Sequence, residues 1–290
     1  MSTRSVLVAG CGFLGVEVAR QFQKSGWQVL GLTHSTETAT KLITEPFPAV
    51  ACDIADSAAV GALAAARGPF DLVVHCASSG RGEAADYRRV YLEGARNLLE
   101  HAAPSFLIFT SSTSVYPQLD GSRVTEESPA DPTRETGRIL RETEELVIGG
   151  GGAVLRLSAL YGAGRSVLLR KFFQGEAVIE GDGHRWINQI HRDDAASAIL
   201  RLGEEKAPGL FNVTDDTPLS QLEVYQWLSH RFGRPLPPRG ESNPNRKRGL
   251  SSKRVSNSRM RSLGWAPTFP SFFTAVAHDP TLAEGCWTGL

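Results

Sequence analysis

The sequence predicts an α/β protein with a doubly wound parallel sheet, followed by a small mixed α/β lobe at the C-terminus. Three observations support this fold class. Short apolar runs alternate with helical patterns through the first half, a glycine-rich turn joins the first run to the first helical pattern, and the alternation loosens beyond about residue 160. Strands that alternate with helices are typical of βαβ units, whose right-handed crossovers build a parallel sheet.

The elements of the first half can be assigned in chain order from composition and periodicity. Short apolar runs indicate buried strands, and apolar residues at helical spacing indicate helices. The expected strands cover residues 5–9, 28–32, 49–52, 71–75, 106–109 and 154–157. The expected helices cover residues 16–22, 56–67, 87–103 and 133–148, with Gly26 as a C-cap and Asp56 as an N-cap.

Two structural parts are expected. Residues 1–160, with a returning segment near 185–215, should form the first domain. Residues 161–184 and 216–290 should form the smaller lobe, where short strands and helices mix with proline-rich connections such as residues 234–238.

The composition excludes two classes of partner. Lys+Arg and Asp+Glu are equal at 31 each among 290 residues, so the chain has no net attraction for nucleic acid or an anionic membrane. No apolar run approaches the roughly 18 residues of a membrane span. The N-terminus lacks the apolar segment and cleavage site of a signal peptide, so we expect a cytoplasmic protein.

The four cysteines, Cys11, Cys52, Cys76 and Cys286, form no C-x-x-C pair. Three of them lie in or beside apolar, strand-like runs. We therefore interpret them as reduced core residues, with a metal or redox site as the alternative.

A glycine-rich turn follows the first expected strand and opens the first expected helix. Its glycines are Gly10, Gly12 and Gly15, in the pattern G-x-G-x-x-G. In this context Gly10 makes the tight turn, Gly12 lets the backbone approach a pyrophosphate at the helix N-terminus, and Gly15 lets the helix pack closely on the strand. The turn predicts a dinucleotide site, and a merely structural turn is the alternative.

The end of the second strand bears on which dinucleotide binds. NAD sites usually carry an acid there, which holds the ribose 2′-hydroxyl. Here the strand is followed by Thr33, His34 and Ser35, which could donate hydrogen bonds to a 2′-phosphate. The sequence therefore favours NADP, with NAD as the alternative and helix capping as another role for these residues. Asp53 and Ile54 follow the third strand, where they face an adenine or form an exposed loop.

Five hydroxyl residues, Thr110 to Ser114, follow the fifth strand, and Tyr116 comes two residues later. Ligands of a parallel sheet bind beyond the carboxyl ends of its strands. The run is therefore placed to face a nicotinamide and a substrate oxygen, and a solvated, helix-capping turn is the alternative.

These patterns together resemble the extended short-chain dehydrogenase/reductase family, which includes sugar-nucleotide epimerases and dehydratases. The resemblance implies an NAD(P)-binding Rossmann domain with a substrate-side C-terminal lobe and a small-molecule substrate. It adds Phe13, Leu14 and Ala77 to the expected cofactor contacts, and it places Ser112 where the family has a catalytic Ser or Thr. The matching stretches are residues 10–15, 111–116, 156–162, 190–194 and 209–213.

The chain departs from this family at the proton relay. The family carries a Tyr-x-x-x-Lys pair on one face of the next helix, where Tyr passes a proton and Lys lowers its pKa. The corresponding positions are Thr136 and Leu140, and Glu144 falls where an acid is usual. Thr cannot act as an acid near neutral pH, and Leu140 cannot hold a ribose hydroxyl. The sequence predicts that the usual relay is missing.

Other side chains leave alternatives open. Tyr116 could supply a phenol to the same crevice as Ser112 or could anchor the turn, and Tyr161 has the same two alternatives. His191 and Asp194 belong to a His-x-Asp-Asp pattern, which we interpret as a helix entry, with Asp194 as a cap and hydrogen-bonding post, in preference to a metal site. A hydrolase triad of these two residues with Ser112 is disfavoured because no G-x-S-x-G elbow is present.

A basic segment near the C-terminus carries no acid. It binds an anionic substrate or forms a solvated face balanced by Glu142, Glu144 and Glu145. The sequence leaves two functions open: an atypical NAD(P)-dependent oxidoreductase or epimerase acting on a small sugar or carbonyl compound, and a non-catalytic dinucleotide sensor or scaffold. A homodimer is also left open by the sequence. The basic segment named above consists of Arg246, Lys247, Arg248, Lys253, Arg254, Arg259 and Arg261.

Overall fold

The computed structural model describes residues 4–80, 82–241 and 251–282. The chain divides into two compact units. The first unit comprises Met1–Val115, Ala130–Arg156 and Ala196–Phe211. The second comprises Tyr116–Pro129, Leu157–Ala195 and Asn212–Leu290.

These units differ in detail from the expected division of the chain. Residues 116–129 group with the second unit, although the sequence places them in the first domain. The segment that returns to the first unit is Ala196–Phe211, which is shorter than the expected 185–215.

The first unit is built around a seven-stranded sheet with the order β12-β7-β5-β4-β1-β2-β3. The registers of β1 with β2 and β4, of β2 with β3, and of β4 with β5 are parallel. The strand order reverses between β1 and β4, which confirms the doubly wound Rossmann arrangement. The strands are β1 Ser5–Ala9, β2 Gln28–Thr33, β3 Ala49–Ala51, β4 Leu72–His75, β5 Leu107–Ser112, β7 Ala153–Leu157 and β12 Gly209–Val213.

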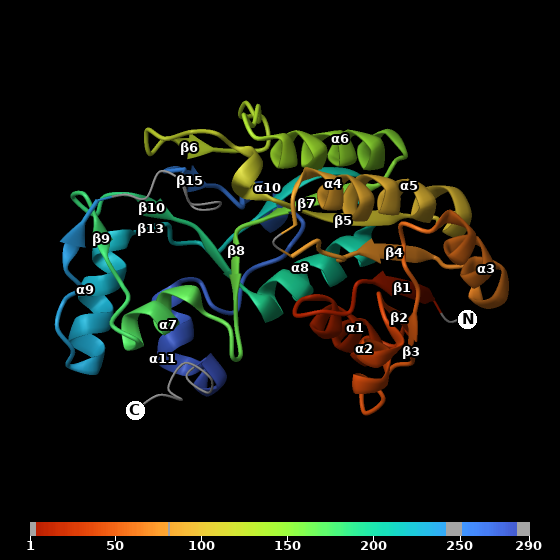
Figure 1. Cartoon of the computed structure of the whole chain (residues 1–290), viewed down its shortest axis with the longest axis horizontal. Coiled ribbons are helices and arrows are strands. Elements are labelled where there is room, and N and C mark those ends of the chain that lie inside the picture. The colour runs from red at the N-terminus through yellow and green to blue at the C-terminus, as the bar shows by residue number, and fades with distance from the viewer. Residues whose placement is uncertain (1–3, 81, 242–250, 283–290) are drawn as a thin grey trace. The chain divides into compact units, whose positions relative to one another are not determined.

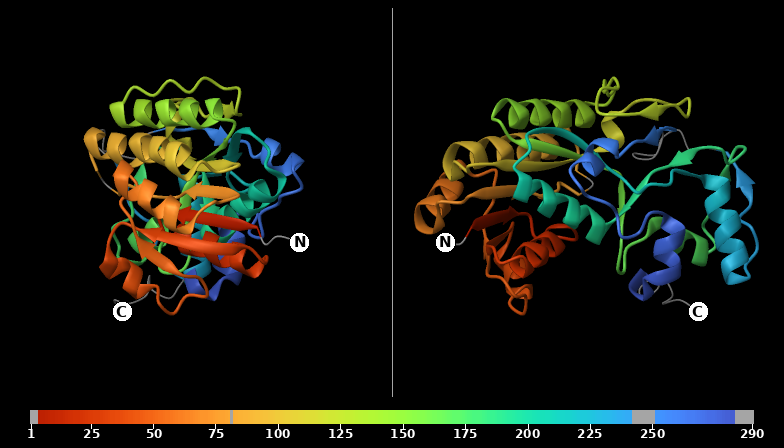
Figure 2. Two further views of the ribbon diagram at one scale, coloured as in Figure 1. Left: turned by 90° about the vertical axis from the view of Figure 1, so that its right-hand side faces the viewer. Right: turned by 180° about the vertical axis from the view of Figure 1, so that it is seen from behind.

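Helices cover both faces of this sheet. In Figure 1, α4, α5 and α6 lie on one side of β4 and β5, whereas α1 and α8 lie on the other, and the view from behind in Figure 2 agrees. A Cβ at Gly203 of α8 would lie 2.7 Å from Leu72 and 3.0 Å from Phe22, so α8 packs on β4 beside α1. The helices are α1 Gly15–Lys24, α2 Thr36–Lys41, α3 Ser57–Arg67, α4 Ala84–Tyr87, η1 Arg88–Glu93, α5 Gly94–Asn97, η2 Leu98–Ala102, η3 Thr113–Val115, α6 Glu135–Gly149 and α8 Arg192–Glu205.

Most expected elements are confirmed, with shifted ends. Asp56 caps α3 as predicted, because its carboxylate accepts a hydrogen bond from the Ala59 N–H at 3.1 Å. The expected helix over residues 87–103 is the continuous run α4-η1-α5-η2, which begins at Ala84 and ends before the left-handed Ala103. Helix α2 was not predicted because it has no buried residue and therefore no apolar periodicity.

A buried ion pair ties α6 to the sheet of the first unit. The Glu144 side chain is 0% exposed, and Arg156 of β7 donates to it from Nη2 at 2.6 Å and from Nε at 3.0 Å. The Ser111 hydroxyl donates to the same carboxylate at 2.5 Å, and Arg141 donates to its Oε2. The charge of Glu144 is therefore compensated inside this unit. Glu144 does not balance the basic C-terminal segment, although that was expected if the segment formed a solvated face.

We expect Arg156→Met to lower the free energy of unfolding by about 3–5 kcal/mol, because it leaves the Glu144 carboxylate buried with one cation fewer. Adding Glu144→Leu should recover much of that loss, since no uncompensated charge then remains in the core. Urea denaturation of the parent, the single variant and the double variant measures both effects. A double variant that is less stable than Arg156→Met would contradict this account.

The second unit has its own apolar core. Rings of Tyr161, Phe172, Tyr225 and Phe272 pack there with aliphatic side chains of three helices. Those helices are α7 Val167–Phe173, α9 Gln221–Phe232 and α11 Phe272–His278, accompanied by α10 Ser258–Ser262 and η4 Pro280–Leu282.

Short two-stranded pairings complete the second unit. They join segments that are far apart in the sequence, so the expected mixed α/β lobe is confirmed in its composition. The pairs are β6 Arg123–Val124 with β15 Arg254–Val255, β8 Ala159–Tyr161 with β11 Gln189–His191, β9 Ile179–Glu180 with β14 Arg239–Gly240, and β10 Trp186–Ile187 with β13 Leu219–Ser220.

Candidate functional site

The glycine-rich turn lies at the point where the strand order reverses. Gly10 follows β1 with a left-handed φ of +102°, and a Cβ there would lie 2.3 Å from the backbone nitrogen of Ala77, which follows β4. A Cβ at Gly15 would lie 2.1 Å from the Gly10 carbonyl oxygen. The tight turn expected at Gly10 and the close packing expected at Gly15 are both confirmed, since no side chain fits at either position.

Gly12 differs from these two glycines. A Cβ at Gly12 would meet no atom within 4 Å, and the residue is exposed at the start of α1. The chain itself therefore offers no steric reason for glycine at this position. The Val16 N–H donates to the Gly12 carbonyl at 3.1 Å, and the helix dipole favours an anion at this end of α1. An open glycine beside such a helix end fits the close approach of a pyrophosphate.

We expect Gly12→Val to abolish dinucleotide binding while leaving the melting temperature close to that of the parent. The valine side chain would occupy the open space over the helix N-terminus without striking the protein. The matched control is Gly15→Ala, which should lower the melting temperature because its Cβ would strike the Gly10 carbonyl. Titration of NADH and NADPH, with circular dichroism melting, measures both. Undiminished binding by Gly12→Val would show that this turn is only structural.

The three residues after β2 have different surroundings. The Thr33 side chain is buried, and its hydroxyl donates to the Ser35 carbonyl at 2.9 Å. Ser35 is the N-cap of α2, where its Oγ accepts from the Thr38 N–H at 3.3 Å. His34 is 71% exposed. Thr33 is therefore corrected as a donor to a 2′-phosphate, because its proton is committed to the backbone. Ser35 caps a helix through its lone pair, which was its alternative role, and His34 faces solvent, so donation by these two residues stays a prediction.

Asp53 and Ile54 lie after β3, and their side chains point into different environments. The Ile54 side chain is buried and lies against Gly94, so it does not face an adenine as expected. The Asp53 carboxylate accepts from the Ala55 N–H at 3.0 Å and pairs with Arg89 at 2.7 Å. Burial acts to raise the pKa of Asp53, but the Ala55 N–H and Arg89 outweigh it and lower the pKa below its usual value.

The hydroxyl run at the end of β5 divides into inward and outward members. Thr110 donates to the His75 carbonyl at 3.0 Å, and Ser111 donates to buried Glu144. Ser112 is half-buried at the end of β5, where its Oγ accepts from the Ser114 N–H at 3.1 Å. Within the residues that the structure describes, this bond uses a lone pair of Ser112 and leaves its hydroxyl proton able to donate to a ligand.

The relay positions lie on α6. Thr136 is half-buried, and Leu140 is 5% exposed within the first unit. The sequence has no lysine between residues 42 and 170, so α6 and the strands β4, β5 and β7 carry none. An apolar side chain at the lysine position neither holds a ribose hydroxyl nor lowers the pKa of a neighbouring acid.

In the second unit, Tyr116 is 1% exposed, and its phenol lies 2.9 Å from both the Thr125 carbonyl and Asn212 Oδ1. Both partners are acceptors, which favours the anchoring interpretation of Tyr116. Its catalytic role stays a prediction that this geometry does not support. Tyr161 is also 1% exposed, and burial, with Asp215 and other acids nearby, raises the pKa of its phenol.

Sequence reasoning missed Lys253, which is buried at 3% exposure. Its ammonium group donates to the Tyr116 carbonyl at 3.0 Å and to Ser251 Oγ at 2.6 Å. Burial lowers its pKa to about 8. Nothing in the local sequence distinguishes Lys253 from its solvated basic neighbours, because its burial comes from residues more than a hundred positions away.

We expect the free energy of unfolding to carry a contribution that rises between about pH 8 and pH 10.5. In that range the unfolded chain keeps the Lys253 proton while the folded chain loses it, so the unfolded state binds more protons and stability rises with pH. Lys253→Met should remove this rise. Urea denaturation of the parent and the variant at several pH values isolates the contribution as a difference. A difference that stays constant with pH would contradict it.

The His-x-Asp-Asp pattern serves structure in the second unit. His191 Nε2 lies 3.0 Å from Asp279 Oδ2, and the Asp194 carboxylate accepts from the N–H groups of Thr268 and Phe269 at 2.7 and 3.0 Å. The hydrogen-bonding post expected at Asp194 is confirmed. The described residues contain no group of three or more ligands that could hold a metal ion.

Two arginines of the basic segment are ion-paired within their own unit. Arg261 pairs with Asp216 at 2.9 Å, and Arg259 pairs with Glu127. Arg254 donates to the Gly121 carbonyl at 2.9 Å. Arg246, Lys247 and Arg248 lie outside the described residues, as does Cys286. Cys11, Cys52 and Cys76 form no disulfide.

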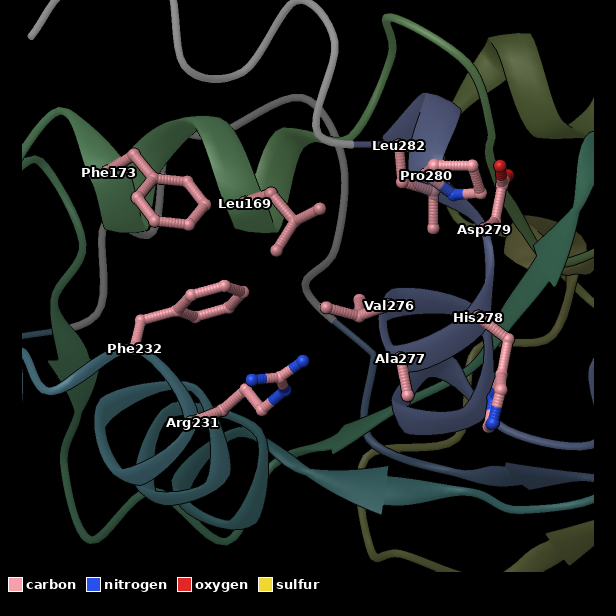
Figure 3. A pocket seen from close by; sticks show the side chains of 10 residues that line it. All are labelled: Leu169, Phe173, Arg231, Phe232, Val276, Ala277, His278, Asp279, Pro280 and Leu282. Carbon is pink, nitrogen blue, oxygen red and sulfur yellow. The ribbon is translucent and has the colours of Figure 1, made fainter.

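The second unit also contains a cavity of about 470 Å³ between α7, α9 and α11 (Figure 3). Apolar side chains line it together with Arg231, His278 and Asp279, and the Arg231 side chain reaches between Phe232 and Val276. None of the site residues predicted from the sequence lines it. In the described chain no helix combines the length and the apolar character that crossing a membrane requires.

Comparison with known proteins defines the family. Residues 6–214 match the NAD dependent epimerase/dehydratase family, and the chain belongs to that family. Protein YeeZ of Escherichia coli K12 is 28% identical over 246 residues, which cover 79% of this chain and 84% of YeeZ. Methionine adenosyltransferase 2 subunit beta of Rattus norvegicus is 31% identical over 262 residues, 80% of this chain and 73% of the subunit. The 2'-dehydrokanamycin reductase of Streptomyces kanamyceticus is 28% identical over 256 residues, 81% of this chain and 68% of the reductase.

Solved structures agree on the fold. A protein from Methylobacillus flagellatus, described as a candidate NAD-dependent epimerase/dehydratase, is 27% identical with a TM-score of 0.78 and covers 98% of both chains. UDP-glucose 4-epimerase of Thermus thermophilus in complex with NAD has a TM-score of 0.80 over 99% of this chain and 100% of the epimerase. At 18% identity, the second likeness concerns the fold alone.

Proposed function

We propose that the chain is an atypical NAD(P)-dependent oxidoreductase or epimerase that acts on a small sugar or carbonyl compound. The observation that carries the proposal is the open position of Gly12 at the start of α1, because the protein itself requires no glycine there. Membership of the NAD dependent epimerase/dehydratase family supports the same conclusion.

The residues of the first unit fit such a cofactor. Gly10 and Gly15 shape the turn, and the backbone from Gly12 through Phe13 and Leu14 would hold the pyrophosphate. Ala77 would flank it at the end of β4. A bound nicotinamide dinucleotide supplies a hydride donor or acceptor. Ser112, whose proton can be donated outward, would orient and polarise a substrate oxygen.

The usual side chains for proton transfer are missing from this site. The Thr136 hydroxyl is too weak an acid to replace a phenol near neutral pH, and buried Leu140 brings no ammonium group. The protein therefore depends on water or on a substrate group for the proton. General acid–base help is typically worth about 10²–10⁴ in rate, so turnover should be slow but need not be absent.

The buried Leu140 favours a second candidate function, a non-catalytic dinucleotide-binding sensor or scaffold. The relatives support both candidates. One relative is named a reductase, and another is named a subunit of an adenosyltransferase, a name that denotes no oxidoreductase. An anionic substrate has little support from the described basic residues, because Arg259 and Arg261 are ion-paired and Lys253 is buried. A cytoplasmic location and a homodimer stay predictions.

We expect the parent protein to bind NADH or NADPH yet to turn over ordinary family substrates slowly. Energy transfer from tryptophan to nicotinamide measures binding, and nicotinamide absorbance on a panel of sugars and carbonyl compounds measures turnover. The double change Thr136→Tyr with Leu140→Lys should raise a trace activity, since it restores a phenol and an ammonium group on one helical face.

The control for that double change is Thr136→Phe with Leu140→Met, which adds similar volume but no titrating group. A parent that binds neither dinucleotide overturns the proposed function. Brisk turnover by the parent that is lost on Ser112→Ala would exclude the sensor and would show that another group moves the proton.

A further inference from the structure

Three side chains from distant parts of the sequence meet beyond the ends of β2 and β3. His34 Nε2 lies 3.4 Å from Asp53 Oδ2, and Arg89 Nη1 lies 2.7 Å from the same oxygen. His34 follows β2, Asp53 follows β3, and Arg89 belongs to η1. All three belong to the first unit. The sequence shows no arginine beside Thr33, His34 and Ser35, so this gathering is visible only in the folded chain.

The position of this cluster matters for cofactor choice. In a Rossmann domain the adenosine ribose lies at the end of the second strand, where an acid holds the 2′-hydroxyl of NAD or a nearby arginine accommodates the 2′-phosphate of NADP. His34 is the exposed residue at that strand end. The structure therefore places the guanidinium group of Arg89 close to His34, which lies where the ribose is expected.

The guanidinium group of Arg89 can exchange the Asp53 carboxylate for a phosphate group. The side chains of Arg89 and Asp53 are 44% and 34% exposed, and an ion pair in contact with water is weak. A 2′-phosphate carries more negative charge than a carboxylate and offers three oxygens to a guanidinium fork. Arg89 also neutralises Asp53, because the formal charge of +1 on the guanidinium group and of −1 on the carboxylate sum to 0. The paired carboxylate therefore repels a phosphate less than an unpaired acid would.

From this geometry we infer that Arg89, assisted by His34, recognises the 2′-phosphate and makes this site selective for NADP over NAD. The inference rests on the proposed dinucleotide site. Asp53 holds the guanidinium group in position before the cofactor arrives, and the imidazole of His34 adds a second donor.

The test compares two neighbouring arginines. Arg89→Gln should weaken NADPH binding about tenfold or more, the usual worth of a charge-assisted hydrogen bond, and should leave NADH binding within about twofold. The matched control is Arg88→Gln. Arg88 is 46% exposed and pairs with Glu142 at 3.2 Å instead of with Asp53, so its replacement should change neither affinity. Energy transfer from tryptophan to nicotinamide at fixed ionic strength measures both dinucleotides.

A second measurement replaces the dinucleotides by two adenosine phosphates. The parent should bind 2′,5′-ADP more tightly than 5′-ADP, with a steeper loss of affinity as salt is added. Arg89→Gln should remove both differences. Equal affinity of the parent for NADPH and NADH, or an equal loss of both in Arg89→Gln, would overturn the role of Arg89 while leaving the dinucleotide site intact. A parent that binds neither dinucleotide would overturn the proposed function itself.

Discussion

The close approach of two backbone segments fixes the position of the glycine-rich turn in the first unit. The turn after β1 passes so near the end of β4 that a Cβ at Gly10 would lie 2.3 Å from the Ala77 nitrogen, and α1 starts so close to that turn that a Cβ at Gly15 would strike the Gly10 carbonyl. Only glycine allows both approaches. Because they are made, the N-terminus of α1 is held at the reversal of the strand order, where the helix dipole favours an anion.

The buried carboxylate of Glu144 has a comparable effect on the opposite face of the sheet. It joins α6 to β7 through Arg156 and to β5 through Ser111. This bond draws one hydroxyl of the Thr110–Ser114 run into the core and leaves the next one, Ser112, facing outward. The electrostatic requirement of a buried charge thus decides which hydroxyl of the run is available to a ligand.

The two halves of the site carry different implications. The phosphate cradle depends on backbone geometry, which is intact. The two positions of α6 that are proposed to correspond to the proton relay hold Thr136 and Leu140. Under the proposed function, this site would bind a dinucleotide without the usual relay, so binding and turnover have to be measured separately. The cluster of His34, Asp53 and Arg89 bears on the choice of cofactor and is independent of the relay.

The sequence by itself determined the fold class and the glycine turn, and it predicts that the usual relay is missing. Each of these depends on residues close together in the chain, where strand and helix periodicity and the need for glycine can be read directly. Tertiary structure decided the rest: that Thr33 is buried while His34 is exposed, that Ile54 faces the core, that Arg89 reaches Asp53, and that Lys253 is buried under the Tyr116 carbonyl. These contacts join residues that are far apart in sequence, and a side chain's burial and charge partners follow from packing that no local pattern encodes.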